Sequence, residues 1–404
     1  MVKSTKVTTK FCRKVKMENL SLFISEYQKV TALFIDILWD MDKIPALLDK
    51  RITSQIQTWL SARALQAAGK QASAIVRGTK AKQSRRLWQI NKFNAQGMFK
   101  KARKLQQIYN KNIASKPLVG DIKPELDSRF VKIDLDNETI FDGWVTLSSL
   151  GNKLTIKIPF KKTKLFNKML ASGIVKAGVR LSKDSITFGF ELEEPKERES
   201  GETLGIDIGQ NSILSCSNGQ VVDKDNHGHN YKTICQKLAR KKKGSKGFRR
   251  GEAHRTNYIN WSVNRLNIHN IKVVRRENIR NMRKGRKSSR NLSHWNYREL
   301  FEKLDSKLKD AGVQIIKVSP TYTSQRCFQC GWVRKGNRKG LLFKCRSCGY
   351  TGNSDLNASQ NIALQLPAIS REQRLKGINR TGFYWLPLEQ ECIVPVAQKT
   401  EIKS

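Results

Sequence analysis

The stretch YTSQRCFQCGWVRKGNRKGLLFKCRSCGYTGNSDLNASQNI, residues 322–362, decides the organisation of this chain. It contains two CxxC pairs, Cys327 with Cys330 and Cys345 with Cys348. Four thiolates at this spacing are typical ligands of a tetrahedral Zn²⁺, and a glycine follows each pair, as the tight turn of a zinc knuckle requires. Because cysteine fills every ligand position, we expect a structural zinc ribbon without a coordination position for a substrate. Disulfides or free thiols are the alternative.

Three carboxylates around this ribbon are candidates for a second metal site. Asp207 lies within the apolar strand pattern LGIDIG, where a buried carboxylate is costly unless it faces a cation. Glu277 ends the strand pattern IKVVRRE, and Asp355 opens a helix just past the ribbon, where helix N-capping is its alternative role. Together they would hold two Mg²⁺ ions, which activate water and stabilise the leaving oxygen when a phosphodiester is cut.

The charge balance predicts a nucleic-acid partner. The 404 residues include 77 Lys+Arg and 34 Asp+Glu, which gives a net charge of +43. Basic residues spread along the whole chain are typical of a long phosphate-binding surface. We expect no membrane association and a cytoplasmic location, because neither a transmembrane-length apolar run nor a signal peptide is present. The scattered Cys12, Cys216, Cys235 and Cys392 are expected to be reduced thiols.

The hydrophobic periodicity predicts a multidomain chain that combines α+β and α/β parts. Helical spacing dominates early, with Phe23, Tyr27, Val30 and Phe34 on one face, and period-two strands follow as an antiparallel barrel or sandwich. Strands and helices then alternate, which indicates a mixed sheet. The expected parts are an N-terminal strand with a helical nucleic-acid-binding lobe (1–125), a β-barrel module (126–200), an α/β domain in two pieces (201–322 and 353–366), the zinc ribbon (323–352) and a tail without assigned function (367–404).

The order of three motifs resembles a known family. LGIDIG, then VVRRENIRNM, then the ribbon followed by DLNASQNI, is similar to TnpB, the transposon-encoded RNA-guided nucleases, and to the compact type V CRISPR effectors. The motifs cover about residues 203–365. Over residues 1–200 the resemblance rests on length and on the order of parts, a helical lobe with a β-barrel.

The resemblance implies an RNase H-like (RuvC) nuclease domain with the zinc ribbon inserted in it, and a wedge-like barrel before it. It also implies that a guide RNA reads most of the target DNA by base pairing, while the protein recognises a short adjacent motif. The activity implied is a Mg²⁺-dependent DNA endonuclease. Its catalytic acids would be Asp207, Glu277 and Asp355.

One departure from the family concerns the middle acid. Family members carry an apolar strand running into this glutamate, whereas Arg275 and Arg276 precede Glu277 here. A register shifted by two residues would put Arg275 at the catalytic position and leave the site incomplete. Glu299 or Glu302, in the following helix, are the other candidates. We favour Glu277, because ENIRNM continues as the family does.

Two other functions compete with the nuclease. One is an RNA-guided DNA-binding protein or repressor whose cutting site has decayed, and the other is a transposase that works without RNA. The sequence leaves open whether the guide RNA comes from a transposon or a CRISPR array. It also leaves open the adjacent motif, the cut position and whether the protein is a monomer or a dimer.

Overall fold

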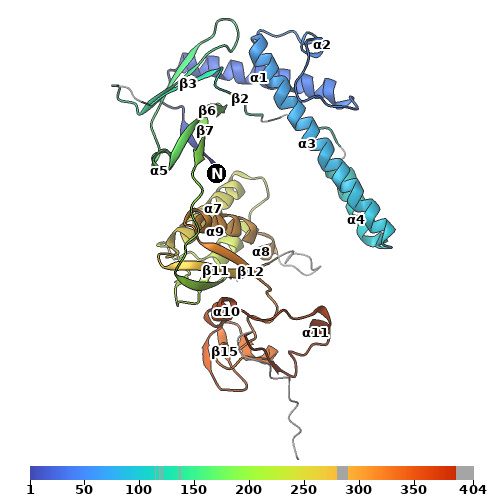
Figure 1. Cartoon of the computed structure of the whole chain (residues 1–404), viewed down its shortest axis with the longest axis vertical. Helices are drawn as coiled ribbons and strands as arrows, with labels where there is room; N and C mark the ends of the chain where they lie inside the picture. Colours follow the sequence, from blue (N-terminus) through green and yellow to red (C-terminus); the bar gives the residue numbers. More distant parts are fainter. Residues whose placement is uncertain (114, 118–119, 121, 136–137, 280–289, 388–404) are drawn as a thin grey trace, which may run out of the picture. The chain divides into compact units, whose positions relative to one another are not determined.

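The chain divides into two compact units, residues 1–193 and 194–404. The computed structural model (Figure 1) describes residues 1–113, 115–117, 120, 122–135, 138–279 and 290–387. The expectation for Cys392 lies outside these residues. No helix in the described part is both long enough and apolar enough to span a bilayer.

Long helices build one side of the first unit. The predicted face of the first helix is correct, since Phe23, Tyr27, Val30 and Phe34 are all fully buried. The third and fourth helices pack on each other as a basic arm, and the Gln83 side-chain amide donates to the Ile113 carbonyl oxygen at 2.8 Å. The helices are α1 (Lys14–Trp39), α2 (Lys50–Thr53), α3 (Ala62–Ala95), α4 (Phe99–Asn112) and α5 (Lys164–Ala171).

Two antiparallel sheets share a core with α1, α2, α3 and α5, and their strand orders are β1-β7-β6-β2 and β3-β4-β5. The expected barrel is not closed among the described residues. The N-terminal strand pairs along β7, so the chain start that we grouped with the helical lobe belongs to the β-module. The strands are β1 (Val2–Thr8), β2 (Glu125–Leu126), β3 (Val131–Asp134), β4 (Gly143–Leu147), β5 (Ile156–Phe160), β6 (Gly173–Leu181) and β7 (Ser185–Leu192).

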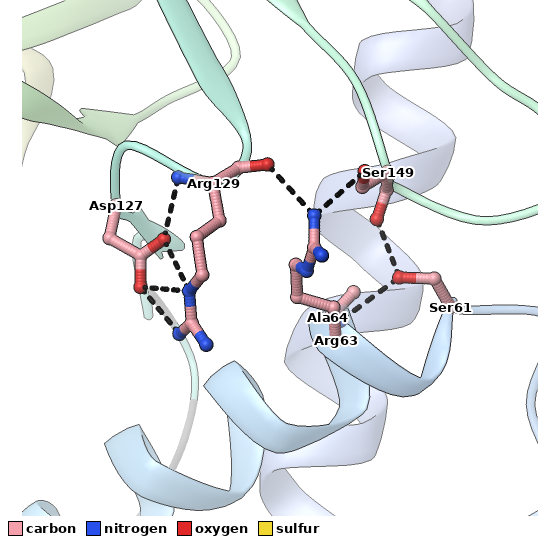
Figure 2. Close-up of polar contacts among 6 residues, drawn as sticks. All are labelled: Ser61, Arg63, Ala64, Asp127, Arg129 and Ser149. Atoms are coloured by element: carbon pink, nitrogen blue, oxygen red, sulfur yellow. Dashed lines mark hydrogen bonds and ion pairs between the residues drawn. The ribbon is translucent and has the colours of Figure 1, made fainter.

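Polar contacts fix the start of α3 to the β-module (Figure 2). Ser61 caps α3 and its hydroxyl also donates to the Ser149 carbonyl oxygen. Arg63 donates to the Arg129 carbonyl oxygen and to the Ser149 hydroxyl, both at 3.2 Å. Arg129 in turn forms a forked ion pair with Asp127, with a shortest nitrogen–oxygen distance of 2.6 Å. The long helix is therefore held at its base by two loops.

A five-stranded mixed sheet forms the centre of the second unit, as predicted. Its order is β10-β9-β8-β11-β12, in which β8, β9 and β10 are an antiparallel meander and β11 runs parallel to both β8 and β12. The strands are β8 (Glu202–Asp207), β9 (Leu214–Cys216), β10 (Val221–Val222), β11 (Ile271–Glu277) and β12 (Gln314–Val318). The helices between them are α6 (Tyr231–Ala239), α7 (Lys246–Arg265), α8 (Arg290–Ser293) and α9 (Tyr297–Asp310).

The zinc-ribbon region follows as short strands, and β16 leads directly into the next helix. The tail, to which we assigned no function, contributes β17, which pairs antiparallel with β13. The elements are β13 (Trp332–Val333), a 3₁₀ turn (Lys335–Asn337), β14 (Arg338–Lys339), β15 (Leu342–Lys344), β16 (Thr351–Asn353), α10 (Ser354–Ala363), α11 (Arg371–Leu375) and β17 (Phe383–Tyr384).

Candidate metal centres

The four ribbon cysteines converge on one point. Their sulfur atoms all lie within 4.8 Å of one another, with Cys327 3.7 Å from Cys348 and Cys330 3.6 Å from Cys345. Zinc–sulfur bonds of about 2.3 Å at tetrahedral angles separate the sulfurs by about 3.8 Å. The cluster therefore has the dimensions of a zinc site, and these distances are far too long for disulfides.

The local backbone explains why the ribbon closes around a cation. Gly331 and Gly349, one after each pair, both have a φ of +77°, the left-handed conformation that glycine adopts without strain. Burial raises the pKa of Cys327 and Cys330, so in the absence of a metal these groups hold their protons. A bound Zn²⁺ would reverse that preference by stabilising the thiolates.

Two of the three predicted acids end adjacent parallel strands. Asp207 is the last residue of β8, and Glu277 is the last residue of β11. Arg276 is in register with Ile206, so Asp207 and Glu277 are the next pair along the ladder. Paired residues of neighbouring strands point to the same face and lie about 5 Å apart at the backbone. The two carboxylates are therefore neighbours at one sheet edge.

The third acid reaches this edge because α10 lies directly on β8. A Cβ built on Gly205 would lie 2.1 Å from the Ser359 carbonyl oxygen, so only glycine permits this approach. Asn353 caps α10 by accepting from the Asp355 backbone N–H at 2.8 Å, which leaves the Asp355 carboxylate free of the N-cap role. That carboxylate would be 3.9 Å from a Cβ on Gly209, just beyond the end of β8.

The electrostatics of Asp207 and Glu277 are in keeping with this placement. Burial first, and then the negative charges of Glu277 and Asp355, raise the pKa of Asp207 well above its usual range. Burial also raises the pKa of Glu277, against lowering contributions from Thr323 and Arg338. Buried carboxylates that oppose each other's ionisation bind a divalent cation with release of protons. Carboxylate oxygens are also the ligands that Mg²⁺ prefers, so the donor chemistry of the three side chains suits such an ion.

Two further residues contact these acids, and sequence reasoning missed both. The Arg338 guanidinium, on β14 of the ribbon, donates to Asp355 Oδ1 at 2.9 Å. The Thr323 hydroxyl donates to Glu277 Oε1 at 2.5 Å. Thr323 stands in the recognisable TSQ motif, but nothing in the spacing of Arg338 distinguishes it from the other basic residues of the ribbon.

Strand alternation accounts for the two arginines before Glu277. Arg276 points to the face opposite Glu277, where it is 4% exposed and pairs with Asp305 of α9 at 2.6 and 2.8 Å. Its guanidinium also lies 4.0 Å from the centre of the Phe301 ring. Arg275 shares the face of Glu277 but lies further back, where it donates to the Gln365 side chain at 3.2 Å. Both arginines thus form contacts away from the strand end, and Glu277 remains the last residue of β11.

The alternative helix glutamates have other partners. Glu299 accepts from the Asn296 side-chain amide at 2.6 Å, and Glu302 accepts from Arg298 at 2.8 Å on the surface of α9. Neither contributes to the pKa shift of Asp207, whereas Glu277 does. The geometry therefore favours Glu277 as the partner of Asp207.

The sequence of this second unit matches known nucleases. Residues 297–362 match the family model of the Cas12f1-like TNB domain. This stretch is Cas12f1-like. A segment of 77 residues is 51% identical to the CRISPR-associated endodeoxyribonuclease Cas12f1 of Sulfoacidibacillus thermotolerans, over 19% of this chain and 18% of that protein. A segment of 86 residues is 36% identical to a TnpB-like protein of Aquifex aeolicus, over 20% and 28%. The predicted resemblance to both groups is confirmed for these segments.

The matches cover a small share of each relative. InsQ of Escherichia coli strain K12, named as a proposed RNA-guided DNA endonuclease, is 37% identical over 84 residues, 20% of this chain and 21% of that protein. The matched segments thus span about a fifth to a quarter of the relatives' length. A solved Cas12f1–sgRNA–target DNA complex aligns at 15% identity with a TM-score of 0.45, over 90% of this chain and 98% of that one.

The ribbon predicts a measurable zinc content. Protein purified without chelators should contain about one zinc ion per chain by elemental mass spectrometry, since four converging thiolates form a closed site. Cys345→Ser should lose that zinc, because a hydroxyl does not replace the thiolate. Cys12→Ser, at a single free cysteine of the first unit, is the control that should retain it. A zinc content unaffected by Cys345→Ser would contradict the assignment.

The Arg276–Asp305 pair predicts a stability effect. Arg276→Ala should lower the free energy of unfolding of the second unit by about 3 kcal/mol, because it leaves the partly buried Asp305 without its cation. The double change to Arg276→Met and Asp305→Leu should recover most of this loss. Arg298→Ala breaks an exposed pair on the same helix and should change stability by less than about 1 kcal/mol. Urea unfolding, with one transition per unit, measures the free energy of unfolding of all three variants. An equal loss of stability in Arg276→Ala and Arg298→Ala would contradict this account.

Proposed function

We propose that this protein is an RNA-guided DNA endonuclease. The observation that carries the proposal is the placement of three carboxylates. Asp207 and Glu277 end neighbouring parallel strands, and Asp355 lies in the first turn of α10, which packs on β8. Carboxylates in this arrangement on a basic protein are suited to metal-assisted phosphodiester hydrolysis. The Cas12f1-like TNB match at residues 297–362 and the similarity of segments of the chain to Cas12f1 and a TnpB-like protein support the DNA substrate and an RNase H-like (RuvC) fold.

The three acids would hold catalytic Mg²⁺, and we propose two ions. Bound there, Mg²⁺ supplies an activated water and stabilises charge on the leaving 3′ oxygen. Glu277 is oriented by Thr323, and the strand ladder keeps it beside Asp207. The Arg338 guanidinium lies at the edge of this cluster, where it is suited to bind the phosphate once a cation takes its place beside Asp355.

A guide RNA would supply sequence recognition, and double-stranded target DNA would be the substrate. From Lys50 to Gly120 the chain contains no aspartate or glutamate, although α3 and α4 carry many lysines and arginines. Such a helical arm attracts a polyanion along its whole length. The net charge of +43 is in keeping with two nucleic-acid partners.

The protein itself would read a short motif beside the target, and we propose a groove of the first unit for this role. The groove has a volume of about 940 Å³ and lies between α3 and the β1-β7-β6-β2 sheet. Gln66, Lys70 and Ala74 line it from one face of α3, because residues four apart share a face. Arg129 and Arg180 line the opposite wall, and each is paired with a carboxylate, which fixes its position.

One observation favours a second function, that of an RNA-guided DNA-binding protein that does not cut DNA. The Arg338–Asp355 ion pair satisfies the third acid with a side chain of the chain itself. If that pair persisted on the target, the protein would bind DNA under RNA guidance without cutting it, as a repressor does.

The nuclease hypothesis predicts the effect of removing each acid. Asp207→Ala, Glu277→Ala and Asp355→Ala should each lower the Mg²⁺-dependent cleavage rate by at least about a hundredfold, as expected when a group that stabilises developing charge is lost. RNA binding should be retained. The assay uses the complex with its co-purified RNA, which is sequenced first, and a matching duplex. Glu302→Ala, on the exposed face of α9, is the matched control and should cut normally.

Each other outcome points to a different function. Cutting that survives both Asp207→Ala and Asp355→Ala would remove the metal-site assignment. Binding of the matched duplex without cutting by the unmodified complex would favour the repressor. Activity that persists after RNase treatment of the complex would favour a protein-only transposase.

The groove predicts that removing the Lys70 side chain weakens DNA binding regardless of the sequence beside the target. Lys70→Ala should weaken binding of the RNA-bound protein to a matched duplex with randomised flanks, and should lower the slope of log affinity against log salt by about one. Lys132→Ala, at an exposed position of β3 outside the groove, is the control. Equal effects of the two changes on affinity and slope would argue against the groove.

A further inference from the structure

The segment after α10 is an integral part of the ribbon. The matched TNB domain ends at residue 362, but the chain continues against the ribbon as far as β17. Trp332 pairs with Tyr384, and the Trp385 backbone N–H donates to the Gly331 carbonyl oxygen at 3.0 Å. A Cβ on Gly382 would lie 2.2 Å from the Trp332 ring, so this contact is close. The segment from 366 to 387 therefore completes a small sheet.

A single buried side chain joins this segment to the ribbon and to α10. Arg326 is 2% exposed. Its Nε donates to the Trp385 carbonyl oxygen at 2.6 Å, and its Nη1 donates to Asn361 Oδ1 at 2.6 Å and to the Cys327 carbonyl oxygen at 3.2 Å. The Arg326 carbonyl oxygen in turn accepts from the Asn357 and Asn361 side-chain amides, both at 2.7 Å. Three segments distant in sequence thus meet at one guanidinium.

The zinc site explains why a charge is tolerated there. A buried guanidinium that bonds only to carbonyl and amide oxygens lacks a neutralising partner, which is unfavourable. Four thiolates around Zn²⁺ leave a net charge of about −2 beside Cys327. Arg326 adjoins that cysteine, so the ribbon supplies the counter-charge and the arginine supplies the hydrogen bonds to α10.

The contacts that Arg326 makes with Trp385 and Asn361, which we call the Arg326 bridge, also affect the carboxylate site. Asp355 lies in the first turn of α10, and Asn357 and Asn361 lie further along the same helix. The ribbon contacts Asp355 through Arg338 and contacts Asn361 through Arg326. The ribbon therefore contacts α10 at two points, Asp355 and Asn361. The arginine that contacts Asn361 also donates a hydrogen bond to the C-terminal segment.

We propose that Arg326 is a positioning residue of the nuclease site, and that the segment from 366 to 387 acts with it to hold the ribbon and α10 in register so that Asp355 faces Asp207 and Glu277. This inference rests on the proposed function for its effect on cutting. The bridge itself is independent of that function and is measurable without it.

Arg326→Lys tests the bridge, because lysine keeps the charge but cannot donate in two directions from a planar fork. Amide hydrogen exchange of the complex should show lost protection at 383–386 and in α10, while zinc content and the affinity for matched duplex stay at the unmodified level. The single-turnover cleavage rate should fall by about ten- to a hundredfold, as for a misplaced catalytic group. Arg334→Lys, at an exposed position of the same ribbon, is the matched control.

A pair of truncations tests the segment. Ending the chain after Leu366 removes β17 and should reproduce the effects of Arg326→Lys, whereas ending it after Pro387 keeps every contact described and should cut normally. Unchanged exchange protection in Arg326→Lys would overturn the bridge, and loss of zinc would show that Arg326 serves the ribbon alone. Normal cutting despite lost protection would overturn the positioning role. An unmodified complex that never cuts would refute the proposed function, while the exchange data would still decide the bridge.

Discussion

The close approach of α10 to β8 at Gly205 is the constraint on which the second unit depends. Any side chain at this position would collide with the helix backbone, since a Cβ would lie 2.1 Å from the Ser359 carbonyl oxygen. Because glycine is there, the first turn of α10 can lie over the end of β8. The negative charge of Asp355 is then close enough to raise the pKa of Asp207. The sheet supplies two acids by register, but the third arrives only through this packing.

The ribbon and the carboxylate site share no ligand residue, but they are connected by side-chain contacts and by the chain itself. All four ribbon cysteines are used as a closed cluster, which leaves them no part in the chemistry of a substrate. The ribbon nevertheless delivers Arg338 to Asp355, and β16 continues without a loop into α10. A zinc ion bound by these cysteines would fix the orientation of α10, the helix that carries Asp355.

Features that depend on local pattern could be predicted from the amino-acid sequence. CxxC spacing identified the ribbon cysteines and the glycines of its turns, because ligand geometry and left-handed backbone are short-range requirements. Period-two and helical spacing identified the buried face of α1 and the mixed sheet, with Asp207 inside one strand pattern and Glu277 at the end of another. The same patterns suggested a closed barrel in the first unit, but the described strands do not form one. Periodicity predicts that a segment is a strand, but it does not specify which distant strand pairs with it.

The different roles of neighbouring residues could not be predicted in this way, because they depend on long-range packing. Arg276 and Glu277 are adjacent in sequence, but strand alternation sends one to Asp305 and leaves the other at the sheet edge with Thr323. Arg338 looks like any basic ribbon residue until folding brings it to Asp355. The C-terminal segment has no pattern of its own, because its β17 is stabilised by pairing with β13 and by Arg326 rather than by its own composition.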